Sequence, residues 1–502
     1  MAAASMSRNA LPATVGLEIH ARLLTGTKLF CRCANRYGDA PNRNTCPVCL
    51  GLPGSLPVLQ AGALNLALRV GLALDCRINE VSRFDRKNYF YPDLPRNYQI
   101  TQFDRPLCVG GQLNWNQDGI TQPVGLRRIH LEEDAGRSVV GRGQPTRVDL
   151  NRAGTPLVEI VTEPDLSGGH PARLWLQGLR RLLVSLEVCD GNMEEGSLRC
   201  DANIGLQGVG DGPWTEVKNL NSFRAVARAV DHEIDRLRTL VAAGETLRRQ
   251  TRSWDERTGA TRLMRHKERE QDYRYFPEPD LPLLTVDPAR LETLREQLPE
   301  LPEARCLRLQ SRHDLAGAEA DLICQWPRLA DYFEKTMDDL LPRLHEGSAG
   351  KVPAGRLTAG WICTETLSGM SERDLRGGSF PVPPVVLAEL LWLLSAGRIS
   401  RSTAKTVHAE YLAGTSGDES PEQIVRRLDL GSIADPVQVR EICWQVLEAA
   451  PSQVKQWLQG KENLFEFFVG RVMAASSGRI APEAARQCLK SLLLARRDDS
   501  SL

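Results

Sequence analysis

The spacing of apolar residues changes once along the chain, and this change constrains the fold more than any other feature. From about residue 14, apolar and polar residues alternate in several segments, including residues 15–22 and 198–206. A period of two is typical of strands in a half-buried sheet, commonly antiparallel. Beyond the proline-rich residues 277–282, apolar residues recur at helical spacing instead. The sequence therefore predicts an α+β fold in which a sheet domain precedes helical domains.

The length of 502 residues exceeds one ordinary domain and suggests about three. We place the boundaries just beyond residues 277–282 and at the glycine- and serine-rich residues 414–420, which gives domains 1–290, 291–412 and 413–502. The expected helices are residues 171–188 and 223–240 within the sheet domain, and residues 291–297, 318–337 with a break at Pro327, 385–395, 421–428 and 437–449 beyond it.

Composition excludes several classes of protein. The chain is 42% hydrophobic and 25% charged, with a formal net charge of +0, so any binding of nucleic acid needs a local basic patch. No run approaches the roughly 20 apolar residues of a membrane span. The first residues lack the apolar stretch of a signal peptide. We therefore expect a cytoplasmic protein whose 13 cysteines are reduced.

Five strand-like segments carry polar residues that suit chemistry. Residues 15–22 place Glu18, His20 and Arg22 on one face, as metal ligands, as an acid/base pair, or as a solvated polar face. Glu133 and Glu159 fall in phase with apolar neighbours. Carboxylates held in such positions suit magnesium bridging ATP phosphates, or else pair with buried arginine.

The other two segments combine cations with carboxylates. The polar residues Ser197, Arg199, Asp201 and Asn203 form one continuous face, and residues 214–220 add Glu216 and Lys218. Phosphoryl transfer needs cations for phosphoryl oxygens and carboxylates for a metal. Cross-strand ion pairs on an exposed sheet would give the same pattern.

Two further segments have distinctive residues. Residues 85–95 interleave Lys87 and other bases with aromatics, which would hold a nucleotide or tRNA end, or would pack the loop onto the core. The loop 31–49 carries Cys31, Cys33, Cys46 and Cys49. Four cysteines in a short loop favour a structural zinc site over a redox pair or incidental thiols.

Several catalytic motifs are missing from the sequence. It has no G-x-x-x-x-G-K-[ST] loop, so an ATP site here is not of the P-loop type. It also lacks H-E-x-x-H, G-x-S-x-G and a serine-rich amidase signature. A reaction that takes ammonia from glutamine would therefore need another polypeptide.

Long strings at these positions resemble the B subunits of the aspartyl/glutamyl-tRNA amidotransferases. The resemblance covers nearly the whole chain, and strings of this length are far more specific than a short motif. The matching strings are VGLEIH, FDRKNYFYPDLPRNYQITQFD, HLEEDAGRS, VDLNRAGTPLVEIVTEPD, MEEGSLRCDANI, EVKNLNSFRAVARA and DYRYFPEPDLP, followed by AGRISRSTAKTV and QGKENLFEFFVGRVM.

The resemblance implies a fold and a reaction. The fold is a cradle resembling glutamine synthetase, followed by a helical domain and a tail domain that contact tRNA. ATP phosphorylates the side-chain carboxylate of Glu-tRNA(Gln) or Asp-tRNA(Asn), and ammonia then gives the amide. Ammonia comes through an internal channel from the glutaminase, or A, subunit, and a small C subunit joins the other two in a heterotrimer. The sequence leaves open which tRNA is the substrate.

The resemblance also implies roles for individual residues. His20, Glu133 and Glu159 match magnesium ligands, and the four cysteines of the loop match the zinc-bearing form of the family; since some members lack them, the metal would be structural. Residues that match catalytic or phosphate-contacting motifs are Glu18, Lys87, Ser197, Arg199, Asp201 and Lys218.

Two alternatives remain beside the amidotransferase hypothesis. A tRNA-binding scaffold without chemistry would have ion-paired inward carboxylates. A free small-molecule ligase would not need the helical C-terminal third, where residues near Trp361 and residues 466–470 depart from the family pattern. The basic residues expected to contact tRNA there are Arg398, Arg401, Lys405, Lys455 and Lys461.

Overall fold

The computed structural model describes residues 11–117, 120–139, 145–209, 214–266, 270–345, 353–431, 433, 435–476 and 478–499. These residues fall into two compact units, the first ending at Leu301 and the second beginning at Pro302. The helix α4 (Pro288–Glu296) packs on α1 (Ala61–Ala73), so the first unit extends past the predicted junction.

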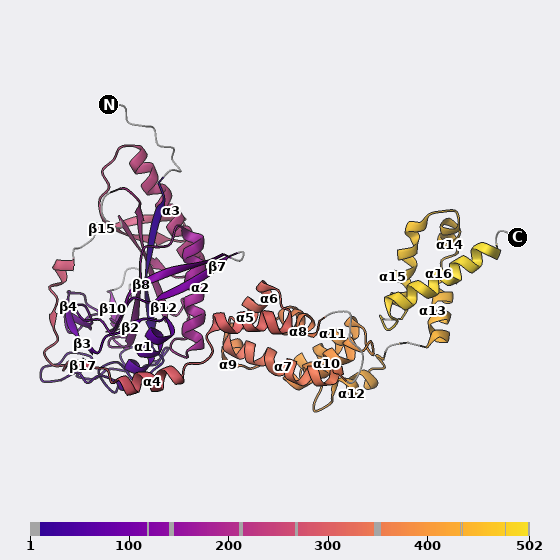
Figure 1. The fold of residues 1–502 in the computed structure, drawn as a ribbon, viewed down its shortest axis with the longest axis horizontal. Coiled ribbons are helices and arrows are strands. Elements are labelled where there is room, and N and C mark those ends of the chain that lie inside the picture. The colour runs from indigo at the N-terminus through magenta and orange to yellow at the C-terminus, as the bar shows by residue number, and fades with distance from the viewer. Residues whose placement is uncertain are drawn as a thin grey trace. The chain divides into compact units, whose positions relative to one another are not determined.

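A ten-stranded sheet organises the described part of the first unit (Figure 1). Its strand order is β15-β14-β13-β12-β1-β11-β8-β6-β2, with β7 paired to β8. Every pair is antiparallel except β13 with β14, which is parallel. The bounds are β1 (Ala13–Arg22), β2 (Arg77–Ile78), β6 (Cys108–Val109), β7 (Gln112–Gln117), β8 (Ile120–Glu133), β11 (Pro156–Thr162), β12 (Leu198–Leu206), β13 (Thr215–Leu220), β14 (Gln250–Asp255) and β15 (Ala260–His266).

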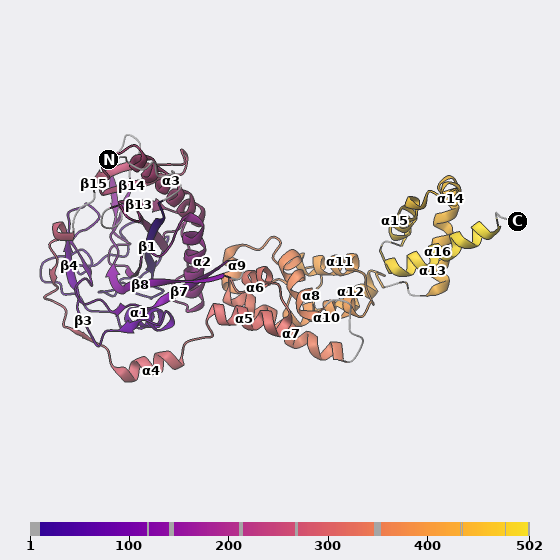
Figure 2. The same ribbon diagram turned by 45° about the horizontal axis from the view of Figure 1, so that its top comes forward.

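One face of the sheet is apolar and covered by helices. In β1, Leu17 and Ile19 are buried, and they belong to a core shared with α2 (Gly169–Ser185) and α3 (Phe223–Ala242). These two helices lie side by side (Figure 1 and Figure 2). Ser222 caps α3 by accepting a hydrogen bond from the backbone N–H of Ala225. Because this face is fully occupied, the polar side chains of the same strands point to the opposite face.

Short strands and loops cover that polar face. The strand β4 (Asp85–Asn88) pairs with β5 (Tyr98–Thr101) and with β16 (Phe276–Pro277), which follows the short helix η1 (Glu270–Tyr273). Two segments far apart in the sequence are thereby brought together. Two smaller ladders complete the unit: β3 (Val81–Ser82) with β17 (Leu284–Thr285), and β9 (Arg137–Val139) with β10 (Arg147–Asp149).

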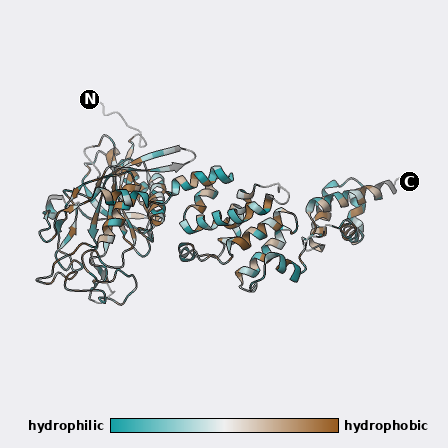
Figure 3. Cartoon of the chain, turned by 60° about the horizontal axis from the view of Figure 1, so that its bottom comes forward, coloured by the Kyte–Doolittle hydropathy of each residue, from teal (hydrophilic) through white to brown (hydrophobic). Residues whose placement is uncertain are grey.

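The described part of the second unit is helical, as predicted. Figure 3 shows hydrophobic and hydrophilic residues alternating along its helices. The predicted break at Pro327 is present, because α6 ends at Ile323 and α7 begins at Pro327. Its elements are α5 (Pro302–His313), α6 (Gly317–Ile323), α7 (Pro327–His345), α8 (Ala354–Trp361), the π-helical turn η2 (Ile362–Thr366), α9 (Glu372–Gly377), α10 (Pro384–Ser395), α11 (Arg401–Leu412) and α12 (Pro421–Arg427).

The last helices form a hydrophobic core of their own, centred on Cys443, Leu447, Phe468 and Leu489. No helix within the described ranges combines the length and the apolar character that spanning a bilayer requires. These last elements are α13 (Pro436–Glu448), α14 (Pro451–Leu458), η3 (Glu462–Leu464), α15 (Phe465–Ala475) and α16 (Pro482–Asp499).

Candidate functional site

The register of the sheet aligns four functional side chains in one row on its polar face. His20 of β1 lies opposite Arg199 of β12 on one side and Glu159 of β11 on the other. Glu159 lies in turn opposite His130 of β8. Directly opposed residues of neighbouring strands project from the same face. The row therefore joins residues from four strands into a single cluster.

Glu132 of β8 completes this cluster. His20 Nε2 lies 3.3 Å from Glu132 Oε1 and 3.2 Å from Glu159 Oε2. His130 Nε2 lies 3.7 Å from Glu132 Oε2 and 3.6 Å from Glu159 Oε2. Both carboxylates are buried, with only 3% and 4% of their surface exposed. We call His20, His130, Glu132 and Glu159 the carboxylate–imidazole cluster.

The cluster is strongly polarised. Burial opposes the charged carboxylate, but hydrogen bonds from His130 and His20 outweigh it and hold the pKa of Glu132 well below its usual range. Burial likewise opposes charge on His20, yet Glu132 and Glu159 raise its pKa well above the ordinary value. The carboxylates and the imidazole therefore stabilise one another's charged forms. The donor atoms fall into two overlapping groups, one of Glu18, His20 and Glu159 and one of His130, Glu132 and Glu159. Within each group they lie within 4.8 Å of one another, a spacing that fits a divalent cation.

Glu133 lies outside this cluster, although the sequence predicted it as a magnesium ligand. Its carboxylate accepts hydrogen bonds from the Arg96 guanidinium and, at 3.0 Å, from the backbone N–H of Ile100. Consecutive strand residues point to opposite faces, so Glu132 and Glu133 cannot both reach the row. Glu133 does share the apolar side, as predicted, and its partner there is a buried arginine.

Glu18 and the β12–β13 polar face extend the site. Lys218 Nζ lies 2.6 Å from Asp201 Oδ2 and 3.1 Å from Glu216 Oε1. These partners outweigh burial and raise the pKa of Lys218. Burial and the nearby Glu159 raise the pKa of Glu18. The sequence grouped these residues correctly on one face, and cross-strand pairing holds the cation in place.

Arg199 and Ser197 have different surroundings. The Arg199 guanidinium donates to Asp134 Oδ2 at 2.6 Å, so its position at the end of the row is fixed. The Ser197 hydroxyl is buried and donates to Asp190 Oδ2 at 3.3 Å. The structure therefore brings Arg199 to the cluster but does not bring Ser197 there.

Three members of the cluster, His130, Glu132 and Glu159, line a cavity of about 170 Å³. Burial opposes charge on Lys87, but Tyr275, Glu132 and Glu159 outweigh it and raise its pKa, so the side chain is a fixed ammonium. Other residues around the cavity include Glu18, Thr101, Gln102, Phe103, Arg128, Glu216, Thr251, Arg265, Tyr273 and Tyr275. Such a cavity can hold a metal and the oxygens of a reacting phosphoryl or carboxylate group between cations.

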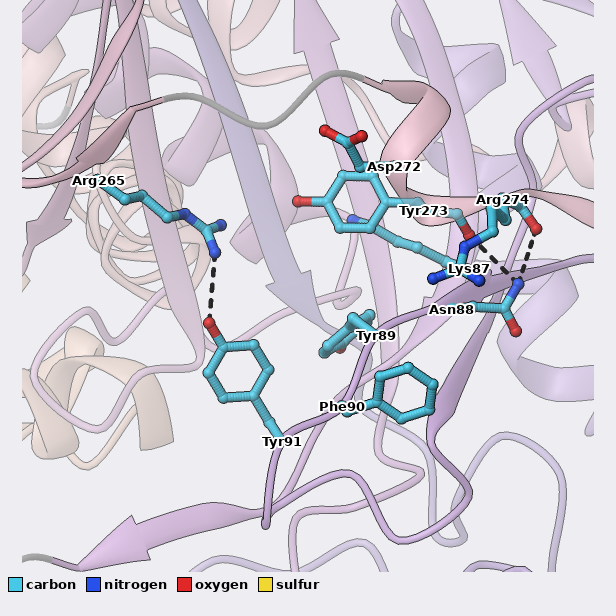
Figure 4. A pocket seen from close by; sticks show the side chains of 9 residues that line it. All are labelled: Lys87, Asn88, Tyr89, Phe90, Tyr91, Arg265, Asp272, Tyr273 and Arg274. Carbon is cyan, nitrogen blue, oxygen red and sulfur yellow. Dashed lines mark hydrogen bonds between the residues drawn. The ribbon is translucent and has the colours of Figure 1, made fainter.

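A larger chamber of about 550 Å³ adjoins the cavity, and Lys87, Arg265 and Tyr273 line both. Figure 4 shows the residues of this chamber, which come from β4 with the turn after it, from the segment around η1 and, for Arg265, from β15. The sequence singled out residues 85–95, but gave no indication that residues 272–274 form the opposite wall.

The four cysteines of the 31–49 loop converge. Their Sγ atoms all lie within 4.8 Å of one another, and those of Cys46 and Cys49 are 3.9 Å apart. Tetrahedral zinc with bonds of about 2.3 Å separates its sulfurs by about 3.8 Å. Hydrogen bonding with Cys31 lowers the pKa of Cys49 to about 4, helped by the Lys28 charge and opposed by burial. The donors therefore fit a thiolate-bound metal.

Lys28 links this cysteine cluster to the backbone at Leu150. It is fully buried, with Nζ 3.6 Å from Cys49 Sγ and 3.3 Å from the Leu150 carbonyl oxygen. Nearby Gly154 adopts φ +84°, and a Cβ there would lie 3.4 Å from Cys49 Cβ, 3.5 Å from Lys28 Cδ and 3.8 Å from Glu133 Oε2. These are ordinary contact distances, so the backbone conformation rather than a lack of space favours glycine at this position.

The basic residues predicted to contact tRNA are all exposed. Arg398 approaches Glu422 at 3.7 Å, and Lys405 pairs with Glu365 at 2.6 Å. Arg401 lies over the Trp361 ring at 5.7 Å, and Lys461 donates to Gln456 at 3.1 Å. With Lys455, they form one group at α10 and α11 and another at α14 and η3.

Comparison with known proteins identifies both halves of the chain. Residues 13–292 match the model of the GatB/GatE catalytic domain, and residues 344–493 match that of the GatB domain. Three curated relatives are each named as the B subunit of aspartyl/glutamyl-tRNA(Asn/Gln) amidotransferase. The protein of Moorella thermoacetica is 44% identical over 96% of this chain and 99% of its own length.

The other two relatives agree with this match over a similar length. The protein of Geobacter sulfurreducens is 43% identical over 96% of this chain and 99% of its own length. That of Thermosynechococcus vestitus is 44% identical over 96% of both chains. Matches of this extent show the family, and the chain therefore belongs to the family of amidotransferase B subunits.

Proposed function

We propose that this chain activates the side-chain carboxylate of glutamate or aspartate on a misacylated tRNA, using ATP, and presents it to ammonia. The observation that carries this proposal is the carboxylate–imidazole cluster in a cavity lined by the cations Lys87, Arg128 and Arg265. Family membership supports the reaction class, because the relatives are named amidotransferases that act on tRNA.

The reaction has two steps. An oxygen of the substrate carboxylate attacks the γ-phosphorus of ATP, and the bond to the β-phosphate oxygen breaks to release ADP. Ammonia then attacks the acyl carbon, phosphate leaves, and the nitrogen loses a proton to give the amide. Both steps collect negative charge on phosphoryl oxygens, which fixed cations stabilise.

We assign roles to the residues on this basis. Glu132, Glu159 and His20 would hold magnesium, which reduces repulsion between ATP and the attacking carboxylate when bound. Lys87, Arg199 and Lys218 neutralise phosphoryl oxygens, and the ion pairs of Arg199 with Asp134 and of Lys218 with Asp201 keep these cations in place. Glu18, whose pKa is raised by burial, accepts the proton from the attacking nitrogen.

The other assignments rest on the surrounding features. The four-cysteine cluster would hold a structural zinc ion. A glutaminase partner would supply ammonia, with a small third polypeptide joining the two, and the exposed basic residues of the second unit would contact tRNA. The thirteen cysteines form no disulfide bond, which supports a reducing compartment, the cytoplasm.

Phosphate release by the chain, purified with its partner polypeptides, tests the proposal. Release that depends on Glu-tRNA(Gln) or Asp-tRNA(Asn) would support carboxylate activation and would identify the substrate. A scaffold without chemistry is favoured by one observation, the ion pairing of Glu133 with Arg96. No stimulation by either charged tRNA would establish the scaffold and refute the proposal.

A further inference from the structure

A second row of polar side chains crosses the outer strands of the sheet. Asn203 of β12 is in register with Glu216 of β13, which is in register with Thr251 of β14. Thr251 is in turn in register with Arg265 of β15. Residues in register on neighbouring strands project from the same face of a sheet. Glu216, Thr251 and Arg265 all line the carboxylate cavity, so this row extends the site to strands that carry no member of the carboxylate–imidazole cluster.

Thr251 lies at the centre of a short series of contacts within this row. Its side chain is buried, with 1% of the residue exposed, and Oγ1 donates to Glu216 Oε2 at 3.0 Å. The other oxygen of Glu216, Oε1, lies 3.1 Å from Lys218 Nζ. Asp201 Oδ2 lies 2.6 Å from the same ammonium. The contacts therefore connect a buried hydroxyl, through one carboxylate, to the Lys218 ammonium.

The opposite face of β14 fixes the place of Thr251. The next residue, Arg252, donates from Nε to Thr261 Oγ1 at 2.8 Å and from Nη2 to the Thr261 carbonyl at 3.0 Å. Arg252 Nε also lies 3.3 Å from Oε1 of Glu233, a fully buried carboxylate of α3. Since α3 connects β13 to β14 in the sequence, this ion pair holds the second strand of the parallel pair against the helix. The register that sets Thr251 beside Glu216 is therefore anchored from below the sheet.

The direction of the Glu216 carboxylate matters for the reaction. Glu216 lines the cavity, where the proposed function collects negative charge on phosphoryl oxygens. A carboxylate turned toward those oxygens would raise the energy of that state, because like charges repel at close range. The Thr251 hydroxyl holds one oxygen of Glu216 beside β14 and leaves the other for Lys218. The cation thus keeps its partner without that partner facing the phosphoryl group.

We propose that Thr251 is a positioning residue for phosphoryl transfer, acting through Glu216 on the direction of the Lys218 ammonium. The inference rests on the proposed function, in which Lys218 neutralises phosphoryl oxygens. An interaction that strengthens as charge develops lowers the barrier without changing the binding of ATP. Removing the hydroxyl should therefore lower kcat and leave the Michaelis constant for ATP nearly unchanged.

Steady-state phosphate release by the complete complex tests this inference. Thr251→Val keeps the shape of the side chain but removes the hydroxyl. We expect kcat to fall about 10- to 100-fold, in line with the cost of about 100-fold for misplacing a catalytic group by about 1 Å. Thr251→Ser restores the hydroxyl and should recover most of the rate.

Thr162→Val is the matched control. Thr162 is also a buried strand residue, 3% exposed, but its hydroxyl accepts from the Leu17 backbone N–H and donates to the Glu163 carbonyl. It is not among the residues that line the cavity. The control should therefore lower the temperature of thermal unfolding, because backbone hydrogen bonds are lost, and leave kcat close to that of wild type.

A double variant shows whether Thr251 acts through Glu216. If it does, Thr251→Val should add nothing to the loss caused by Glu216→Gln, which has already removed the charge that the hydroxyl directs. Unchanged kcat in Thr251→Val, equal losses in Thr251→Val and Thr251→Ser, or additive losses in the double variant would each overturn the inference while the proposed function stands. Absence of phosphate release that depends on charged tRNA in wild type would overturn the proposed function itself.

Discussion

The first unit contains two clusters suited to metal, and they are built in opposite ways. The cysteine cluster takes all its donors from one loop, residues 31–49. The carboxylate–imidazole cluster takes His20, Glu132 and Glu159 from three strands, and only the sheet register joins them. Close spacing makes the first cluster readable from the sequence. The second depends on tertiary structure, and its buried carboxylates face a cavity where a substrate can react.

The largest effect is expected from changing a carboxylate of the carboxylate–imidazole cluster. Glu159→Gln keeps the shape of the side chain but removes the charge that would hold a divalent cation. We expect phosphate release to fall about 1000-fold or more, a barrier increase of about 4 kcal/mol. Glu163→Gln is the matched control, because this carboxylate is 41% exposed and pairs with Arg127 at 2.9 Å. Near-normal release by Glu159→Gln at low magnesium would remove Glu159 from the metal site.

Changes to the cysteine cluster should lower the stability of the protein rather than its activity. Cys46→Ser removes one of four thiolates, so we expect bound zinc to disappear and the free energy of unfolding to fall by about 3 kcal/mol. Folded molecules that survive should keep most of their phosphate release. Zinc analysis and thermal unfolding measure both effects, with Cys363→Ser as a control outside the cluster. Wild-type protein without zinc would contradict the assignment.

The adjacent residues Glu133 and Glu132 of β8 should show different effects, a loss of stability at the first and a loss of activity at the second. Glu133→Gln leaves the buried Arg96 without its anionic partner, so we expect a loss of about 2–3 kcal/mol in stability. The adjacent Glu132→Gln should instead reduce phosphate release, as at Glu159. Urea unfolding and kinetics on both variants give the comparison. A change of magnesium dependence in Glu133→Gln, with stability intact, would place Glu133 at the metal after all.

The smallest effect is expected at Lys28. Lys28→Met keeps the length of the buried side chain but removes the charge 3.6 Å from Cys49. Groups that support metal ligands typically change affinity about 10- to 100-fold. We expect zinc affinity, measured by competition with a chromogenic chelator, to fall by about tenfold. Arg36→Met, a 70% exposed cation in the same loop, should have no measurable effect.

The sequence predicted the class of fold and much of the site. Period-two alternation located β1 and β12, and placed Arg199 and Asp201 on one face, because one face of each strand is buried. The sequence could not show whether Glu132 or Glu133 joins the carboxylate–imidazole cluster. Both are buried, since β8 has cover on both faces at this end. Only the pairing of Glu159 with His130 shows which of them joins the cluster.

Ser197 and the chamber show two other limits. Ser197 continues the polar pattern of β12, but lies just before the strand and bonds to Asp190. The segment at Tyr273 closes the chamber only because β16 returns to pair with β4, a contact between residues about 190 positions apart in the sequence. A local sequence pattern does not show which distant segment will pair with a given strand.

The single-loop origin of the cysteine donors gives the two sites different freedom to change in evolution. One deletion within residues 31–49 could remove the thiols together. No comparable deletion removes the carboxylates without removing a strand from the centre of the sheet. The thiol site can therefore be lost in a lineage as one event, whereas the reactive site has to be inherited with the fold.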